Sequence, residues 1–237
     1  MTELLILVIL TLGAGLAMPL GALLARVENI HPHWLEEEFR HSAIAFGGGA
    51  LLSAVALVLV PTGIAELTPL AASTCVVAGA LGFMALDIYL VKLNTPASQL
   101  AAMLMDFVPE SIALGAAFEM ESNDALLIAG LIALQNIPEG FNAYRELKQP
   151  ALMNGKTIIV IFCLMALLGP AAGVGSYLWL RDTPGVVAVI VLMASGGILY
   201  SIFQDIAPKV RLEQHWAPPL GAVLGFVMGM AGYMLAG

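Results

Sequence analysis

The sequence has few charged and few aromatic residues. Only 11% of its 237 residues are charged and 7% are aromatic, whereas 60% are apolar. Soluble domains carry roughly 25% charged residues, so this composition excludes a water-soluble domain. Sustained alternation of apolar and polar residues is also missing, which excludes a transmembrane β-barrel. A helical membrane protein remains, and the 24 glycines and 13 prolines are typical of spanning helices.

Basic residues, cysteines and histidines are scarce as well. Nine Lys and Arg residues stand against seventeen Asp and Glu residues, and the net charge of −8 excludes a nucleic-acid partner. The two cysteines, Cys75 and Cys163, lie in separate apolar runs without a Cys-x-x-Cys pattern, which is typical of small buried residues. The four histidines lie in or beside predicted loops, so none is expected at the middle of a span.

Eight apolar runs are long enough to cross a bilayer as helices, which takes about 20 residues each. They cover residues 3–25, 41–65, 68–91, 99–120, 125–145, 157–180, 184–206 and 217–236. The boundary near Thr68 and Pro69 is the weakest of the separators. No stretch between the runs is long enough to fold alone. The sequence therefore predicts an all-α, multi-pass protein of the cell (inner) membrane, with residues 1–237 as a single transmembrane domain.

The distribution of Lys and Arg predicts the orientation, because cytoplasmic loops retain positive charge. With the N-terminus placed outside, eight of the nine basic residues lie on the cytoplasmic side. Only Arg181 lies on the external side. One missed or extra span would destroy this asymmetry, so we expect eight crossings and both termini outside the cytoplasm.

Several carboxylates lie inside the predicted spans. An ionised side chain at the middle of a spanning helix costs about 2.5–3.5 kcal/mol on insertion scales, and such residues usually mark a transport path. The sequence places no Lys or Arg at the same depth to neutralise them, so they must be protonated or share a cation. These carboxylates are Asp87, Asp106, Glu110, Glu139 and Asp205.

Two of the spans carry matched motifs. Residues 106–111 read Asp-Phe-Val-Pro-Glu-Ser, and residues 135–140 read Gln-Asn-Ile-Pro-Glu-Gly. Each motif has an oxygen-bearing side chain at position i and Glu at i+4, which places both on one helical face. Each also has Pro directly before the Glu, and this Pro removes a backbone hydrogen bond and exposes a carbonyl one turn back.

The two motifs lie in neighbouring spans of opposite direction and form a short inverted repeat. Broken helices in such repeats build the midplane site of many transporters. The predicted ligands are all oxygen donors: Asp106, Glu110, Gln135 and Glu139, with Asn136 as a further candidate. Carboxylate and carbonyl sites suit Mg²⁺, Mn²⁺ and Ca²⁺, and Zn²⁺ also accepts carboxylate oxygen. A protonated Glu beside a helix kink is the structural alternative for each motif.

These motifs resemble those of the ZIP (Zrt/Irt-like) family of divalent metal transporters. That family typically carries His-Asn-x-Pro-Asp/Glu-Gly in its fourth helix and His-Asn/Asp-x-Pro-Glu-Gly in its fifth. Weaker echoes are the three glycines at 47–49 before Val60-Pro61, and residues 196–200 leading into residues 204–208. The chain looks like a divergent, prokaryotic-type member, since Phe107 stands where the family has Asn and both motif histidines are replaced.

The resemblance implies eight helices, a metal site between the fourth and fifth, and import towards the cytoplasm by alternating access or an elevator-like movement. It also implies a homodimer. The substrate would be a divalent metal ion such as Zn, Mn, Fe or a Cd-like ion, with no organic cofactor. The primary site would comprise Asp106, Glu110, Gln135 and Glu139, with Asn136 as the remnant of a second site. Asp205, Asp87 and Gln204 are candidate pathway or proton sites.

Two other functions remain open. The first is a relative that binds metal as a sensor or scaffold without transporting it. The second is an intramembrane lipid pyrophosphate phosphatase, because such enzymes also use a Gln/Glu-x-x-x-Glu pair and Gln135 to Glu139 fits it. That chemistry needs cationic groups to hold phosphate oxygens, and the spans offer none at depth. We therefore expect a transporter and no enzyme.

Overall fold

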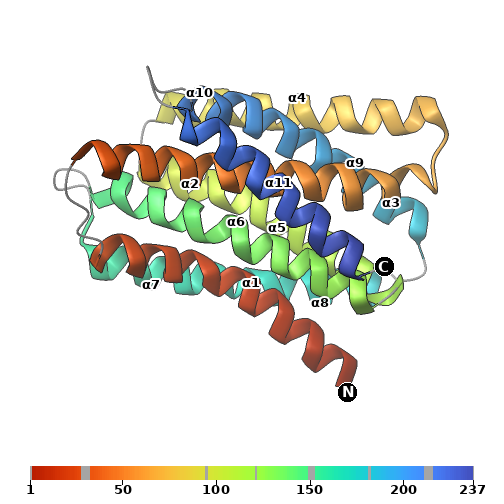
Figure 1. Cartoon of the computed structure of the whole chain (residues 1–237). Coiled ribbons are helices and arrows are strands. Elements are labelled where there is room, and N and C mark those ends of the chain that lie inside the picture. The colour runs from red at the N-terminus through yellow and green to blue at the C-terminus, as the bar shows by residue number, and fades with distance from the viewer. Residues whose placement is uncertain are drawn as a thin grey trace.

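The structure is a computed structural model that describes residues 2–27, 33–93, 96–120, 122–148, 153–180, 183–210 and 216–236. Across these ranges every regular element is helical, and no strand is present. The helices run roughly side by side as one elongated bundle (Figure 1). The predicted all-α fold class is confirmed.

Long helical segments occupy all eight of the predicted apolar runs. Two of these segments contain π-helical turns (η), and one is divided at Leu167. In chain order the elements are α1 (Thr2–Val27), α2 (His33–Ala54), η1 (Val55–Leu59), α3 (Val60–Ile64), α4 (Pro69–Leu93), α5 (Pro96–Met120), α6 (Ser122–Lys148), α7 (Gly155–Ala166), α8 (Leu168–Trp179), α9 (Pro184–Ser201), η3 (Ile202–Ile206), α10 (Ala207–Val210) and α11 (Ala217–Ala236).

Six of these segments are long and apolar enough to cross a membrane: Glu3–Val27, Glu38–Ile64, Pro69–Lys92, Gly155–Trp179, Pro184–Ile206 and Ala217–Leu235. Their length and composition indicate a multi-pass membrane protein. The two segments outside this set are α5 and α6, which carry the two Pro-Glu motifs. Eight crossings therefore stay a prediction.

The turn between α3 and α4 lies where the weakest boundary is predicted. Residues 65–68 form the turn, and α4 begins at Pro69. Thr68 caps the new helix, since its hydroxyl oxygen accepts from the Ala71 N–H at 3.4 Å and its carbonyl accepts from the Ala72 N–H at 2.9 Å. A Thr directly before a helix-initiating Pro is a strong local start signal.

Each π-helical segment ends two residues before a proline. The N–H of Val60, before Pro61, bonds to the Val55 carbonyl, and the N–H of Ala207, before Pro208, bonds to the Ile202 carbonyl. Because proline has no N–H, the ordinary i to i−4 pattern is interrupted there. The wider turn re-pairs the backbone at these two points, as π-bulges commonly do near functional sites.

Glycines bring several helix pairs into close backbone contact. A Cβ atom at Gly21 would collide with the Ile137 carbonyl oxygen, and one at Gly140 with the Met18 carbonyl oxygen, which joins α1 to α6. Gly49 similarly fits against Ala222 between α2 and α11, and Gly79 against Met193 between α4 and α9. Small residues that allow such approach drive helix association in lipid.

The packing divides the helices into two groups. In the first group α1 packs on α6, α7 and α8, and α5 packs on α6 and α8. In the second group α2 packs on α11, and α9 packs on α3 and α4. The groups meet chiefly where α2 contacts α6 and where α5 contacts α9. The two motif helices therefore belong to the same group, and each contacts the other group.

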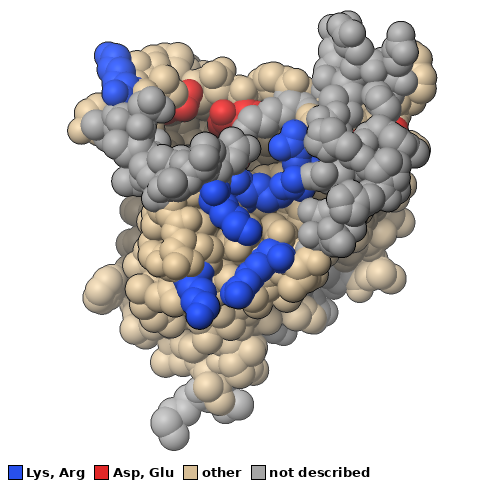
Figure 2. Space-filling view, turned by 90° about the vertical axis from the view of Figure 1, so that its left-hand side faces the viewer, with Lys and Arg blue, Asp and Glu red and all other residues tan. Residues whose placement is uncertain are grey.

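The basic residues gather at one end of the bundle. Figure 2 shows Lys and Arg side chains clustered on this face, where α1, α4 and α6 end and α7 begins. Thr2 of α1 and Ala236 of α11 lie at the opposite end (Figure 1). The described members of the cluster are Arg26, Arg40, Lys92, Arg145, Lys148 and Lys156. Arg181, Arg211 and the side chain of Lys209 lie outside what the structure describes, and the external location of the termini stays a prediction.

Candidate metal site

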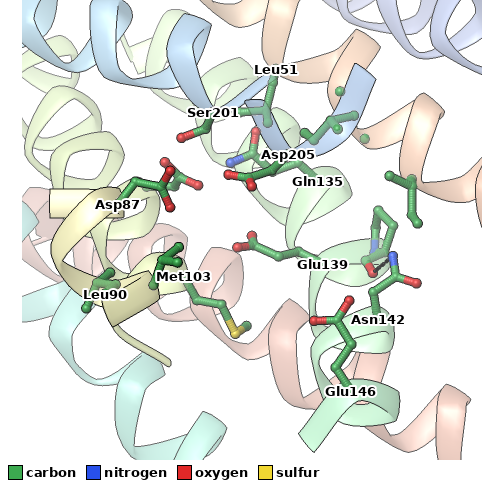
Figure 3. A pocket seen from close by; sticks show the side chains of 17 residues that line it. Leu51, Asp87, Leu90, Met103, Gln135, Glu139, Asn142, Glu146, Ser201 and Asp205 are labelled. Atoms are coloured by element: carbon green, nitrogen blue, oxygen red, sulfur yellow. Dashed lines mark hydrogen bonds between the residues drawn. The ribbon is translucent and has the colours of Figure 1, made fainter. Parts of the chain in front are cut away.

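A cavity of about 380 Å³ lies between the two helix groups. Its walls come from the second half of α2, the last turns of α4, the first half of α5, the second half of α6, the end of α9, and η3. All these segments lie towards the basic end of the bundle. The polar residues lining the cavity are Asp87, Asp106, Gln135, Glu139, Asn142, Glu146, Ser201 and Asp205 (Figure 3).

The cavity is strongly acidic. Five of its lining residues are carboxylates, and no Lys, Arg, His or Cys is found among the described residues that line it. Asp106 interacts electrostatically with Asp205, and Glu139 with Asp106 and Glu110. Like charges this close repel one another, and a cation between them removes the repulsion.

Beyond the cavity, towards the end where the termini lie, the two groups close on each other through apolar side chains. Leu51, Val55 and Leu59 pack with Ala113 of α5 and with residues of α9. The described α9 members of this cluster are Val187, Val191 and Ile198. This apolar packing lies between the cavity and the end of the bundle where the termini lie.

The second motif, on α6, supplies the longest polar face of the cavity. Gln135, Glu139, Asn142 and Glu146 all line it and follow a spacing of four, three and four residues. This spacing keeps side chains on one face of an α-helix. Gly140 in turn holds the neighbouring face of α6 against α1, and that contact fixes which way the polar face points.

The first motif, on α5, divides between two environments. Asp106 lines the cavity, and its Oδ1 is buried without a hydrogen-bond partner among the described residues. Glu110 is only 4% exposed and does not line the cavity. Its carboxylate instead accepts from Gln135 Nε2, with contacts of 2.5 Å to Oε1 and 2.6 Å to Oε2. The motifs therefore meet, but through a hydrogen bond between side chains.

The second helix group contributes two carboxylates. Asp87 of α4 accepts a hydrogen bond from the Tyr200 hydroxyl, with Oδ2 at 3.0 Å. Asp205 lies within η3, and the π-helical turn presents it to the cavity. Gln204, predicted alongside Asp205, lines a separate apolar cavity between α4 and α9 instead.

Asn136 lies on a different face of α6 from its neighbour Gln135. It is fully buried, and its Nδ2 donates to the Ala14 carbonyl of α1 at 2.9 Å. It does not line the cavity. The residue suggested as the remnant of a second metal site therefore ties α6 to α1, next to the glycine contacts of the same pair.

Of the predicted set, the structure brings Asp106, Gln135 and Glu139 into one cavity, together with Asp87 and Asp205. Glu110, Asn136 and Gln204 point elsewhere. In the part of the chain that the structure describes, no three His, Cys, Asp or Glu side chains converge closely enough to hold a metal ion. The four-ligand arrangement predicted from the sequence is thus not assembled in this conformation.

Three cavity residues escaped the sequence prediction: Asn142, Glu146 and Ser201. Asn142 and Glu146 continue the face of Gln135 and Glu139 by helical periodicity, and this signal is sufficient to find them. Glu146 lies one residue beyond the predicted span 125–145, whereas α6 continues to Lys148. Hydropathy shows where the apolar run ends, but the helix itself continues beyond that point, so residues in its last turn are missed.

Replacing Asn136 with Asp tests whether this residue is an anchor or a ligand. The substitution keeps an oxygen but removes the N–H that bonds to Ala14, and it sets a carboxylate against a buried carbonyl. We expect a loss of about 2–3 kcal/mol of stability without metal, measured by thermal unfolding in detergent. Asn142→Asp, at the cavity, is the matched control and should lose less. A stable Asn136→Asp variant with tighter metal binding would identify a ligand instead.

No protein-family model and no curated protein matches this chain. The family resemblance therefore depends on the two motifs, and the function has to be argued from the cavity.

Proposed function

We propose that the protein transports divalent metal cations across the membrane, through the acidic cavity between its two helix groups. The observation that carries the proposal is the concentration of Asp87, Asp106, Glu139 and Asp205 around one cavity inside an apolar bundle. Carboxylates at this depth are costly unless a cation or protons neutralise them. A divalent cation neutralises two of them and accepts the amide oxygen of Gln135 as a further ligand.

The arrangement of the two groups supports alternating access. The cavity lies towards the basic end, which the positive-inside rule assigns to the cytoplasm. Apolar packing closes the opposite side of the same interface. A sliding or rocking movement of the α1, α5, α6 and α7–α8 group against the other would open the opposite side in turn. Import into the cytoplasm through a ZIP-like, elevator-type movement, with a homodimer as the assembly, is the form that the motif resemblance suggests.

The chemistry of the cavity favours transport over phosphate chemistry. A lipid pyrophosphate phosphatase needs cationic side chains around its phosphate oxygens. The described residues lining this cavity include no such group. An acidic wall instead repels phosphate and attracts metal ions.

The direct test is flux into proteoliposomes that contain the purified protein. We expect saturable uptake of Mn²⁺ or Zn²⁺ above the rate of protein-free liposomes, together with metal bound to the purified protein by elemental analysis. Binding without flux would indicate a sensor or scaffold. Absence of both binding and flux across Mg²⁺, Ca²⁺, Mn²⁺, Fe²⁺ and Zn²⁺ would overturn the proposal.

A further inference from the structure

Gln135 is the residue that keeps the predicted ligand set apart. Its Nε2 lies 2.5 Å and 2.6 Å from the two carboxylate oxygens of Glu110, so a single amide engages both. Both residues are almost fully buried, at 3% and 4% exposure. A hydrogen bond in such a dry environment is stronger than the same bond in water.

This contact withholds Glu110 from the cavity. A carboxylate can bind a metal ion only through its oxygens, and both oxygens of Glu110 face the Gln135 amide. The amide oxygen of Gln135, Oε1, is buried and has no hydrogen-bond partner among the described residues. Asp106 Oδ1 is likewise buried and without such a partner. The cavity therefore offers Asp106, Glu139 and the Gln135 oxygen to a cation, while Glu110 stays behind the amide.

We propose that Gln135 promotes release of the metal ion. In the conformation open to the basic end, its hydrogen bond to Glu110, which we call the clasp, keeps Glu110 from binding the ion. The site then has one ligand fewer and a lower metal affinity on the side where the ion leaves. The inference rests on the proposed transport function. A carrier needs a site that binds the ion on one side of the membrane and releases it on the other. While the Gln135–Glu110 clasp is formed, the metal affinity of the site is low. When the clasp breaks and Glu110 turns to the ion, the affinity is high.

A double-mutant cycle tests the clasp with Mn²⁺ as the probe, using calorimetry on the purified full-length protein and flux in proteoliposomes. Gln135→Met removes the donor and keeps the side-chain length. Glu110→Gln is isosteric and retains a hydrogen-bonding oxygen for the clasp. Because the clasp holds Glu110 away from the ion, Glu110→Gln alone should change the Mn²⁺ affinity less than about threefold.

Gln135→Met loses one neutral amide oxygen but frees the Glu110 carboxyl group to bind the ion. Because a carboxylate is the stronger ligand and the cost of breaking the hydrogen bond no longer opposes binding, this variant should bind Mn²⁺ about tenfold more tightly. Its maximal flux should fall, since release becomes slow. Adding Glu110→Gln to this variant should remove the gain in affinity. Asn142→Leu is the matched control: this cavity amide donates to the Pro138 carbonyl at 2.8 Å instead, so its effect should not depend on residue 110.

The outcomes separate the two levels of the proposal. A wild-type protein without Mn²⁺ or Zn²⁺ binding or flux contradicts the transport function itself. A wild-type protein that transports, combined with a Glu110→Gln variant that weakens binding tenfold or more, makes Glu110 a direct ligand and overturns the clasp. The clasp is also overturned if Gln135→Met weakens Mn²⁺ binding by the same factor in the wild-type and in the Glu110→Gln background. Gln135 would then act only as a ligand. If Gln135→Met does not fold, the Glu110→Gln result alone decides.

Discussion

Glu139→Gln is expected to lower metal flux by about 100-fold while leaving the protein folded, because removing one charged ligand of a buried ion costs several kcal/mol. Glu139 lines the cavity and, from the second motif, interacts with both carboxyl groups of the first, Asp106 and Glu110. The amide keeps the shape and the oxygen of the side chain but removes the charge. In the absence of metal it also relieves repulsion, so thermal stability should be equal or higher.

The measurement is initial Mn²⁺ uptake into proteoliposomes, with reconstitution efficiency and unfolding temperature recorded for each variant. Glu66→Gln is the matched control, since Glu66 is an exposed carboxylate in the turn between α3 and α4, at the end away from the cavity. It should transport like the wild type. Near-normal flux by Glu139→Gln would remove the cavity from the transport path.

The helices were predictable because a bilayer imposes their length. Each of the eight apolar runs coincides with a long helical segment, and even the uncertain boundary at Thr68 and Pro69 is correct, since Thr caps and Pro initiates a helix. Helix ends were less predictable. Helix α2 begins at His33 rather than at residue 41, because a helix continues into polar sequence beyond the hydrocarbon, where hydropathy carries no signal.

The site was predictable in composition and only partly in geometry. Spacing of i and i+4 leaves two side chains about 40° apart around a helix with 3.6 residues per turn. On α6 that offset keeps Gln135 and Glu139 in the same cavity. On α5 it is enough to send Asp106 into the cavity and Glu110 towards Gln135. Whether both side chains face the same neighbour across this 40° offset depends on how the helices pack. The pattern of a single sequence does not specify that packing.

The residues of the second helix group were predictable as buried charges but not as a cavity wall. Asp205 and Gln204 are adjacent in sequence and are both predicted pathway or proton sites, yet they line different cavities. The π-helical turn that contains both residues changes the angular spacing on which a 3.6-residue pattern depends. Pro208, which interrupts the hydrogen-bond pattern at this turn, is visible in the sequence. A proline near the end of a span therefore predicts that side chains before it depart from the 3.6-residue spacing.

Gly140→Ala is the second substitution with a large expected effect, and it tests the packing that orients the site. A Cβ at residue 140 would collide with the carbonyl oxygen, carbonyl carbon and Cα of Met18. All three are backbone atoms, so neither helix can yield by a side-chain rotation. We expect a loss of at least about 3 kcal/mol, seen as a lower unfolding temperature or as failure to assemble. Gly130→Ala on the same helix meets nothing within 4 Å and should be neutral or stabilising by up to about 1 kcal/mol, since alanine favours helix.

Equal stability of the two variants would mean that α1 and α6 do not pack as closely as in this structure. The Asn136–Ala14 bond and the direction of the Gln135–Glu139 face would then both lose their physical basis, because each depends on that contact.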